Sequence, residues 1–79
     1  MIITAEISYY PLTDNFSKPI DYFIQLISKS NITIETGKMS TVLIGEYQDI
    51  MDVLQKSMSE LLNKYSSIFN IKISNSCPI

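Results

Sequence analysis

The sequence predicts an α+β protein with the element order β-α-β-β-α-β. Two stretches repeat apolar residues with the 3.6-residue period of amphipathic helices, and four alternate them with the period of two that strands require. A glycine turn separates the second and third strands, which makes them neighbours in an antiparallel hairpin. Two helices on one face of an antiparallel sheet bury these apolar surfaces together, which is the ferredoxin-like sandwich.

The expected first strand covers residues 2–10, and Pro11 ends it. Its more apolar face carries Ile3, Ala5, Ile7 and Tyr9. In the first helix, Ser17 is the expected N-cap, and Pro19 is tolerated in the first turn because its missing N–H would have no partner there. The apolar positions of this helix are Ile20, Phe23, Ile24 and Ile27. Asn31 is expected to end it in a left-handed conformation.

The two central strands are expected over residues 32–36 and 39–46. Gly37 and Lys38 join them in a two-residue turn that is compatible with type II′. The second helix has the most regular pattern, and its apolar positions are Tyr47, Ile50, Met51, Leu54, Met58, Leu61, Leu62 and Tyr65. The methionines at core spacing are Met39, Met51 and Met58. The last strand alternates Phe69, Ile71 and Ile73 with polar residues.

The composition is that of one small domain, residues 1–79, and it argues against several classes of function. A chain of this size buries only about 60% of its unfolded surface, so association with further copies would add stability. It has no arginine and a net charge of −2, which disfavours nucleic acid and phosphorylated ligands. Without histidine and with one cysteine, Cys77, a conventional zinc site and a His-based catalytic triad are not expected.

No targeting or membrane-spanning segment is expected. The first residues lack a basic region, Glu6 interrupts their apolar run, and no apolar run approaches the ~20 residues of a membrane span. A single cysteine allows no disulfide within the chain, which fits a reducing cytosol. Cys77 is expected to be inert, because no basic residue lies beside it to lower its pKa.

Three blocks of the sequence resemble the YKOF-related family, whose members bind thiamine or its hydroxymethylpyrimidine half. The blocks are YYPLTDNF (9–16), MSTVLIG (39–45) and ISNSCP (73–78), and residues 45–51 also resemble the related single-domain thiamine-binding proteins. The resemblance implies a ferredoxin-like fold, a cytoplasmic location and no catalysis, with thiamine as a bound ligand rather than a catalytic cofactor. Some members carry two domains in tandem, which implies a homodimer or homotetramer here.

The resemblance also implies ligand contacts at Ser8 and Tyr9, near the end of the first strand, and at Ser40 and Thr41. Neighbours on a strand point to opposite faces, so Ser40 and Thr41 cannot both direct their side chains at one ligand. Thr41 shares its face with the apolar Met39 and Leu43 and is the favoured contact. Ser40 is expected to bond backbone or to face the other way. A backbone carbonyl could equally satisfy a buried Thr41 hydroxyl.

The aromatic and acidic residues of the strands each have two interpretations. Tyr9 and Tyr10 offer flat faces to a thiazolium cation, although an aromatic residue near a strand end is more often part of the core. The strand acids are Glu6, Glu35 and Glu46. They are interpreted as solvated charges that discourage aggregation, or as partners for an aminopyrimidine or a thiazolium.

Three functions remain open from the sequence. The first is non-catalytic binding of thiamine or hydroxymethylpyrimidine in the cytosol, linked to uptake or buffering. The missing arginine suits an unphosphorylated cation. The second is an interaction or regulatory module that acts through oligomerisation, because one sheet face has no helix to cover it. The third is a small enzyme, which is disfavoured because no pair of acidic, basic or nucleophilic residues has a catalytic arrangement.

Overall fold

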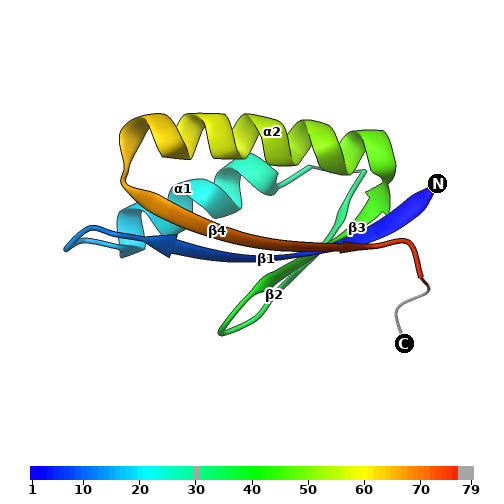
Figure 1. Cartoon of the computed structure of the whole chain (residues 1–79), viewed down its shortest axis with the longest axis horizontal. Helices are drawn as coiled ribbons and strands as arrows, with labels where there is room; N and C mark the ends of the chain where they lie inside the picture. The colour runs from blue at the N-terminus through cyan, green and yellow to red at the C-terminus, as the bar shows by residue number, and fades with distance from the viewer. Residues whose placement is uncertain (30, 77–79) are drawn as a thin grey trace.

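A computed structural model describes residues 1–29 and 31–76 of the chain. Its elements follow in the predicted order (Figure 1). They are β1 (Ile2–Pro11), α1 (Ser17–Ile27), β2 (Thr33–Thr36), β3 (Thr41–Glu46), α2 (Tyr47–Lys64) and β4 (Ser67–Ser74). Ser30, Cys77 and Pro78 lie outside the described residues, so the expectation for Cys77 and the end of the third family-like block do too.

The four strands form one antiparallel sheet in the order β2-β3-β1-β4. β1 lies in the interior and pairs with β3 on one side and β4 on the other. Its residue Ile7 is opposite Thr41 of β3 and opposite Ile71 of β4. Both helices cover the same face of the sheet (Figure 1). The predicted ferredoxin-like fold is therefore confirmed.

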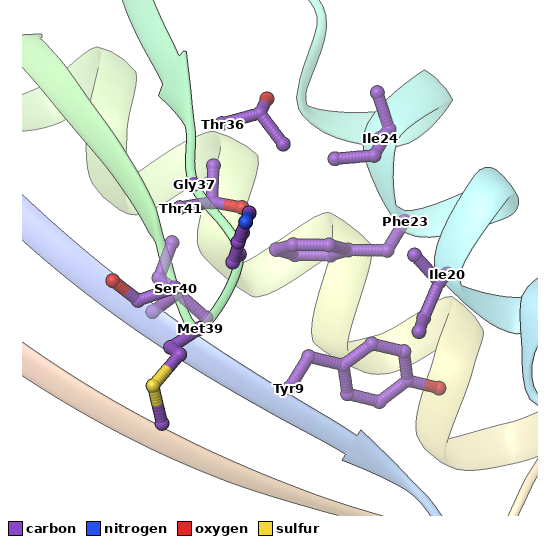
Figure 2. A pocket seen from close by; sticks show the side chains of 11 residues that line it. Tyr9, Ile20, Phe23, Ile24, Thr36, Gly37, Met39, Ser40 and Thr41 are labelled. Atoms are coloured by element: carbon purple, nitrogen blue, oxygen red, sulfur yellow. The ribbon is translucent and has the colours of Figure 1, made fainter.

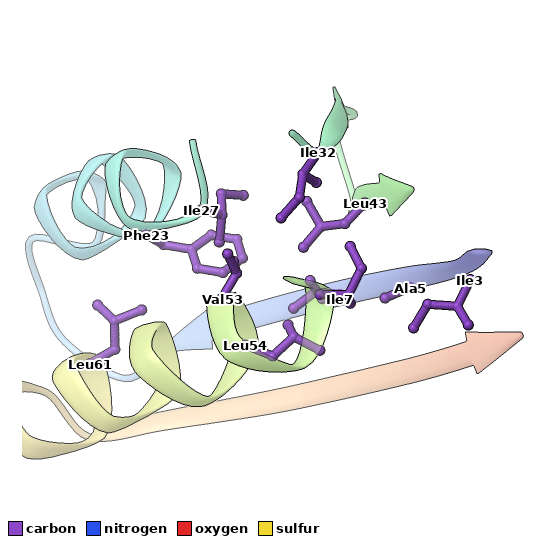
Figure 3. Close-up of a cluster of buried hydrophobic side chains, with 11 residues drawn as sticks. Ile3, Ala5, Ile7, Phe23, Ile27, Ile32, Leu43, Val53, Leu54 and Leu61 are labelled. Carbon is purple, nitrogen blue, oxygen red and sulfur yellow. The ribbon is translucent and has the colours of Figure 1, made fainter. Parts of the chain in front are cut away.

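The core lies between the helices and the sheet face that they cover, here called the inner face. The buried apolar side chains are Ile3, Ala5, Ile7, Phe23, Ile27, Ile32, Leu43, Ile50, Val53, Leu54 and Leu61 (Figure 3). The alternate residues of β1 point to the other side, the outer face, where Thr4, Glu6 and Ser8 are only half-buried. The face predicted to be apolar along β1 is therefore the one that the core uses.

The apolar pattern of the helices overstates what is buried. Ile20, Tyr47 and Leu62 are exposed, although their spacing predicts core positions. One face of α2 is buried, and one of its residues is a serine. The buried residues are Ile50, Val53, Leu54, Ser57 and Leu61. Ser57 is fully buried because its hydroxyl donates a hydrogen bond to a carbonyl one turn earlier, at 2.8 Å.

The predicted helix ends of α1 are wrong in detail. Ser17 is the first helical residue, Phe16 occupies the N-cap position, and no side chain caps the helix. The Ser17 hydroxyl donates instead to the Asn15 side chain at 3.1 Å. After the helix, Ser28 is extended. Asn31 is not left-handed, because no non-glycine residue in the described ranges has a positive φ.

The connection between β2 and β3 is longer than predicted. Thr36 pairs with Thr41, so four residues form the loop, and β3 begins two residues later than expected. The Gly37 N–H donates to the Ser40 carbonyl at 2.9 Å. Neither glycine has a positive φ, which rules out the type II′ turn. Met39 lies in this loop with 86% of its surface exposed, so its predicted core position is also wrong.

We predict that Leu43→Ala lowers the free energy of unfolding by about 2–5 kcal/mol, measured by urea unfolding. Leu43 is fully buried, and its removal leaves a cavity that the packed core refills only in part. Leu62→Ala is the matched control, because that side chain is 54% exposed, and its change should stay within about 0.5 kcal/mol. Equal losses from the two variants would contradict this assignment of the core.

Candidate functional site

A cavity lies between α1 and the loop that joins β2 to β3 (Figure 2). Its volume is about 130 Å³. Its lining includes Tyr9 of β1, Phe23 and Ile24 of α1, and Thr36, Lys38 and Thr41 of the hairpin. Sites for whole drug-sized ligands usually enclose about 300–1,000 Å³. The cavity therefore suits one small ring better than a larger molecule.

The aromatic wall of the cavity is held in place by contacts within the core. The Tyr9 ring stacks on Phe69 with centroids 4.6 Å apart, and Phe23 lies tilted at 5.4 Å from Tyr9. The Tyr9 hydroxyl is 3.0 Å from the Ser67 hydroxyl and shares a hydrogen bond with it. Tyr10, the neighbour, lies on the outer face with 49% of its surface exposed. The wall is therefore in place before any ligand arrives.

Thr41 brings a hydroxyl to a mostly apolar part of the cavity wall. It is the first residue of β3 and only 6% exposed. Its hydroxyl makes no hydrogen bond to any described residue. Every fully buried side-chain oxygen of the described residues does have a hydrogen-bond partner, so the Thr41 hydroxyl is not fully buried. The hydroxyl oxygen therefore keeps some exposed surface in a residue that lines the cavity, and no backbone carbonyl of the described residues accepts a hydrogen bond from it. A nearly buried hydroxyl in this position is stabilised by a ligand that can bond to it.

Ser40 and Ser8 hold their hydroxyls on the outer face. Ser40 borders the cavity, but its side chain points away from it (Figure 2) and donates to the Glu6 carboxylate at 3.0 Å. The Ser8 hydroxyl donates to the Met39 carbonyl at 3.3 Å. The Lys72 ammonium lies 3.8 Å from the other Glu6 oxygen. Three predicted contacts therefore border the cavity, but of these the Ser40 hydroxyl lies on the far side of the sheet, as the Ser8 hydroxyl does.

Phe23 and Lys38 are among the cavity residues that were not predicted contacts. Phe23 follows the core spacing of α1, and Lys38 reads as a turn residue, so neither pattern signals a site. Lys38 is exposed and is the one charged residue in the described lining. None of the strand acids Glu6, Glu35 and Glu46 lines the cavity, and Glu46 pairs with the N-terminal amine at 2.9 Å.

The cavity offers a flat aromatic wall, the Thr41 hydroxyl and the Lys38 ammonium group. Over the described ranges, no three histidine, cysteine, aspartate or glutamate residues come together to hold a metal ion. Neither helix among those residues combines the length and apolar character needed to cross a membrane. What the arrangement can do chemically is bind a small flat polar ring.

Comparison with known proteins places the chain among its relatives. A UPF0045 protein of Methanocaldococcus jannaschii is 32% identical over 63 residues, which are 77% of this chain and 63% of the relative. The chain therefore spans less than two thirds of that relative's length. The solved structure of a hypothetical M. jannaschii protein matches with a TM-score of 0.83 and 28% identity, over 96% of this chain and 81% of the other.

Two further solved structures share the fold. A candidate thiamine biosynthesis/salvage protein of Thermotoga maritima matches with a TM-score of 0.83 and 23% identity, over 96% of this chain and 85% of the other. A Streptococcus pneumoniae protein matches with a TM-score of 0.87 and 22% identity, over 96% and 88%. The model of the family described as thiamine-binding protein matches residues 5–76. Because that match covers most of the chain, this protein belongs to the thiamine-binding protein family, as its resemblance to YKOF-related proteins predicts.

Proposed function

We propose that this chain is a non-catalytic binding protein for thiamine or hydroxymethylpyrimidine, and that the pyrimidine ring occupies the cavity between α1 and the β2–β3 loop. The observation that carries the proposal is the Thr41 hydroxyl, which reaches this cavity without a partner in the described part of the chain. An aminopyrimidine has ring nitrogens that accept hydrogen bonds and an amino group that donates them. Family membership supplies the ligand class, and the hydroxyl supplies a bond that such a ring can use.

The size of the cavity favours the pyrimidine half of the ligand. A volume of about 130 Å³ is well below that of sites that enclose drug-sized molecules. The ring would lie against Tyr9 and Phe23, and an aromatic pair adds about 0.5–1.5 kcal/mol beyond the buried area. The thiazolium of whole thiamine would then stay outside the cavity.

The charge around the cavity points the same way. Lys38 borders the cavity and no carboxylate of the described residues does, so a thiazolium inside would meet a like charge and no balancing anion from them. The strand acids therefore do not supply the partner that the sequence suggested as an alternative. The lack of arginine still disfavours a bidentate grip on a diphosphate, so the proposal keeps an unphosphorylated ligand.

The proposal includes the cellular setting that the family resemblance implies. The protein would act in the cytoplasm, in vitamin uptake or buffering, as a homodimer or homotetramer and without a catalytic cofactor. An interaction module without a small ligand is the second candidate. The observation that favours it is the outer sheet face, where Val42 and Ile44 are only half-buried and no helix covers them.

We predict that hydroxymethylpyrimidine raises the melting temperature at least as much as thiamine does, and that thiamine diphosphate raises it no more. A ligand that binds only the native state adds stability in proportion to ln(1 + [L]/Kd). Thermal melting with each compound at equal concentration measures this, and calorimetric titration gives the affinities. A stable oligomer whose melting temperature none of the compounds changes would support the interaction module instead.

We predict that Thr41→Val weakens the binding of hydroxymethylpyrimidine about 2- to 13-fold in calorimetric titration. The substitution keeps the side-chain shape and removes a hydrogen bond worth about 0.5–1.5 kcal/mol. Thr33→Val is the control, because Thr33 is an exposed strand threonine outside the cavity lining. Unchanged affinity in the Thr41 variant would refute the role of this hydroxyl.

We predict that Ser8→Ala and Ser40→Ala each change the affinity less than twofold. Both hydroxyls lie on the outer face and bond to groups of the protein itself, so a ligand in the cavity loses no side-chain contact when they are removed. The same titration measures the effect. If these variants lose affinity while Thr41→Val keeps it, the ligand lies on the outer face instead.

A further inference from the structure

Lys38 brings a positive charge without a balancing anion to the opening of the cavity. It lies in the loop between β2 and β3, and it is the one charged residue among the described residues that line the cavity. Two ion pairs form within the described part of the chain, and Lys38 belongs to neither. Its side chain is exposed. The ammonium group can therefore act on whatever enters or leaves the cavity.

The strand acids near the hairpin lie on the other side of the sheet. Thr36 lines the cavity, and neighbouring residues on a strand point to opposite faces, so Glu35 faces outward. The Glu6 carboxylate accepts a hydrogen bond from Ser40 at 3.0 Å on that same outer face. The sheet thus separates both carboxylates from the cavity opening, and the charge that a ligand meets there is positive.

The exposed part of the lining defines the way out of the cavity. Phe23 and Thr41 are buried and form part of its floor. Ile20 of α1 and residues 36–39 of the hairpin are exposed, and they form a rim around the opening (Figure 2). Any part of a ligand that is too large for the cavity therefore lies between Ile20 and the loop that carries Lys38.

Hydrogen bonds hold the backbone of Lys38 beside this opening. The Gly37 N–H donates to the Ser40 carbonyl across the loop at 2.9 Å, and the Ser8 hydroxyl donates to the Met39 carbonyl at 3.3 Å. A Cβ at residue 37 would lie 3.1 Å from the Ser40 carbonyl oxygen, so the glycine permits this close approach. The loop is therefore tied both to itself and to β1, and the charge of Lys38 stays at the rim.

We infer that Lys38 makes the site selective for an uncharged pyrimidine over whole thiamine. This inference rests on the proposed function, which places the pyrimidine ring in the cavity. In thiamine, a single methylene joins the thiazolium to that ring, so the positive charge emerges at the rim. In hydroxymethylpyrimidine, the same position carries a neutral hydroxyl, which can accept a hydrogen bond from an ammonium group. The substrate class of the site is then the free pyrimidine alcohol.

Size alone would also favour the smaller ligand, because a cavity of about 130 Å³ does not hold both rings of thiamine. A thiamine analogue in which an uncharged thiophene replaces the thiazolium separates charge from size. Two unit charges about 7 Å apart in water repel enough to weaken binding about threefold. The unmodified chain should therefore bind the analogue about threefold more tightly than thiamine at low ionic strength, and added salt should reduce the difference.

Calorimetric titration of Lys38 variants tests this selectivity. The ratio of the dissociation constant for thiamine to that for the analogue should fall about threefold in Lys38→Gln and about sevenfold in Lys38→Glu, because the repulsion is first removed and then reversed. Lys56→Glu is the matched control, since Lys56 is exposed on α2 outside the cavity lining and its substitution changes the net charge by the same amount. This control should leave the ratio unchanged.

Three results would contradict the role of Lys38. If the compounds bind but the ratio is the same in the unmodified chain and in Lys38→Glu, this inference is overturned while the proposed function stands. If Lys56→Glu lowers the ratio as much as Lys38→Glu does, the overall charge of the protein acts instead of the rim. If hydroxymethylpyrimidine, thiamine and the analogue all fail to bind, the proposed function fails and the selectivity fails with it.

Discussion

The structure depends on the alternation of side chains along the interior strand β1. Neighbouring residues on a strand point to opposite faces, so Ile3, Ala5 and Ile7 enter the core while the residues between them face outward. The next inward position is Tyr9, whose ring continues the apolar layer into the cavity wall. Pairing with β3 carries the same division across the sheet and brings Thr41 to the inner side. Core and candidate site are therefore parts of one layer.

The candidate site lies where the core layer ends without being fully covered. α1 contributes Phe23 and covers Tyr9 on one side, and the four-residue hairpin loop approaches from the other. A ring bound between them would complete the packing and give the Thr41 hydroxyl a partner. In a chain this small, the free energy of unfolding is marginal. Ligand binding and association would each add to it, because both act on the folded state alone.

The outer face of the sheet carries a small cluster of polar and charged side chains. On the outer face, the Glu6 carboxylate accepts a hydrogen bond from Ser40 and lies near Lys72, so a charged cluster is balanced within the sheet. The cavity is built without β4.

The sequence by itself determined the element order, the two faces of the sheet and the family, because apolar periods and short motifs are local properties of the chain. It also predicted the side of the sheet that Thr41 takes. Only the tertiary structure decided that Phe23 and Lys38 meet Thr41 at one cavity. Such meetings depend on loop length and on how far a helix extends over the sheet. Those are distances between segments remote in sequence, which no local pattern contains.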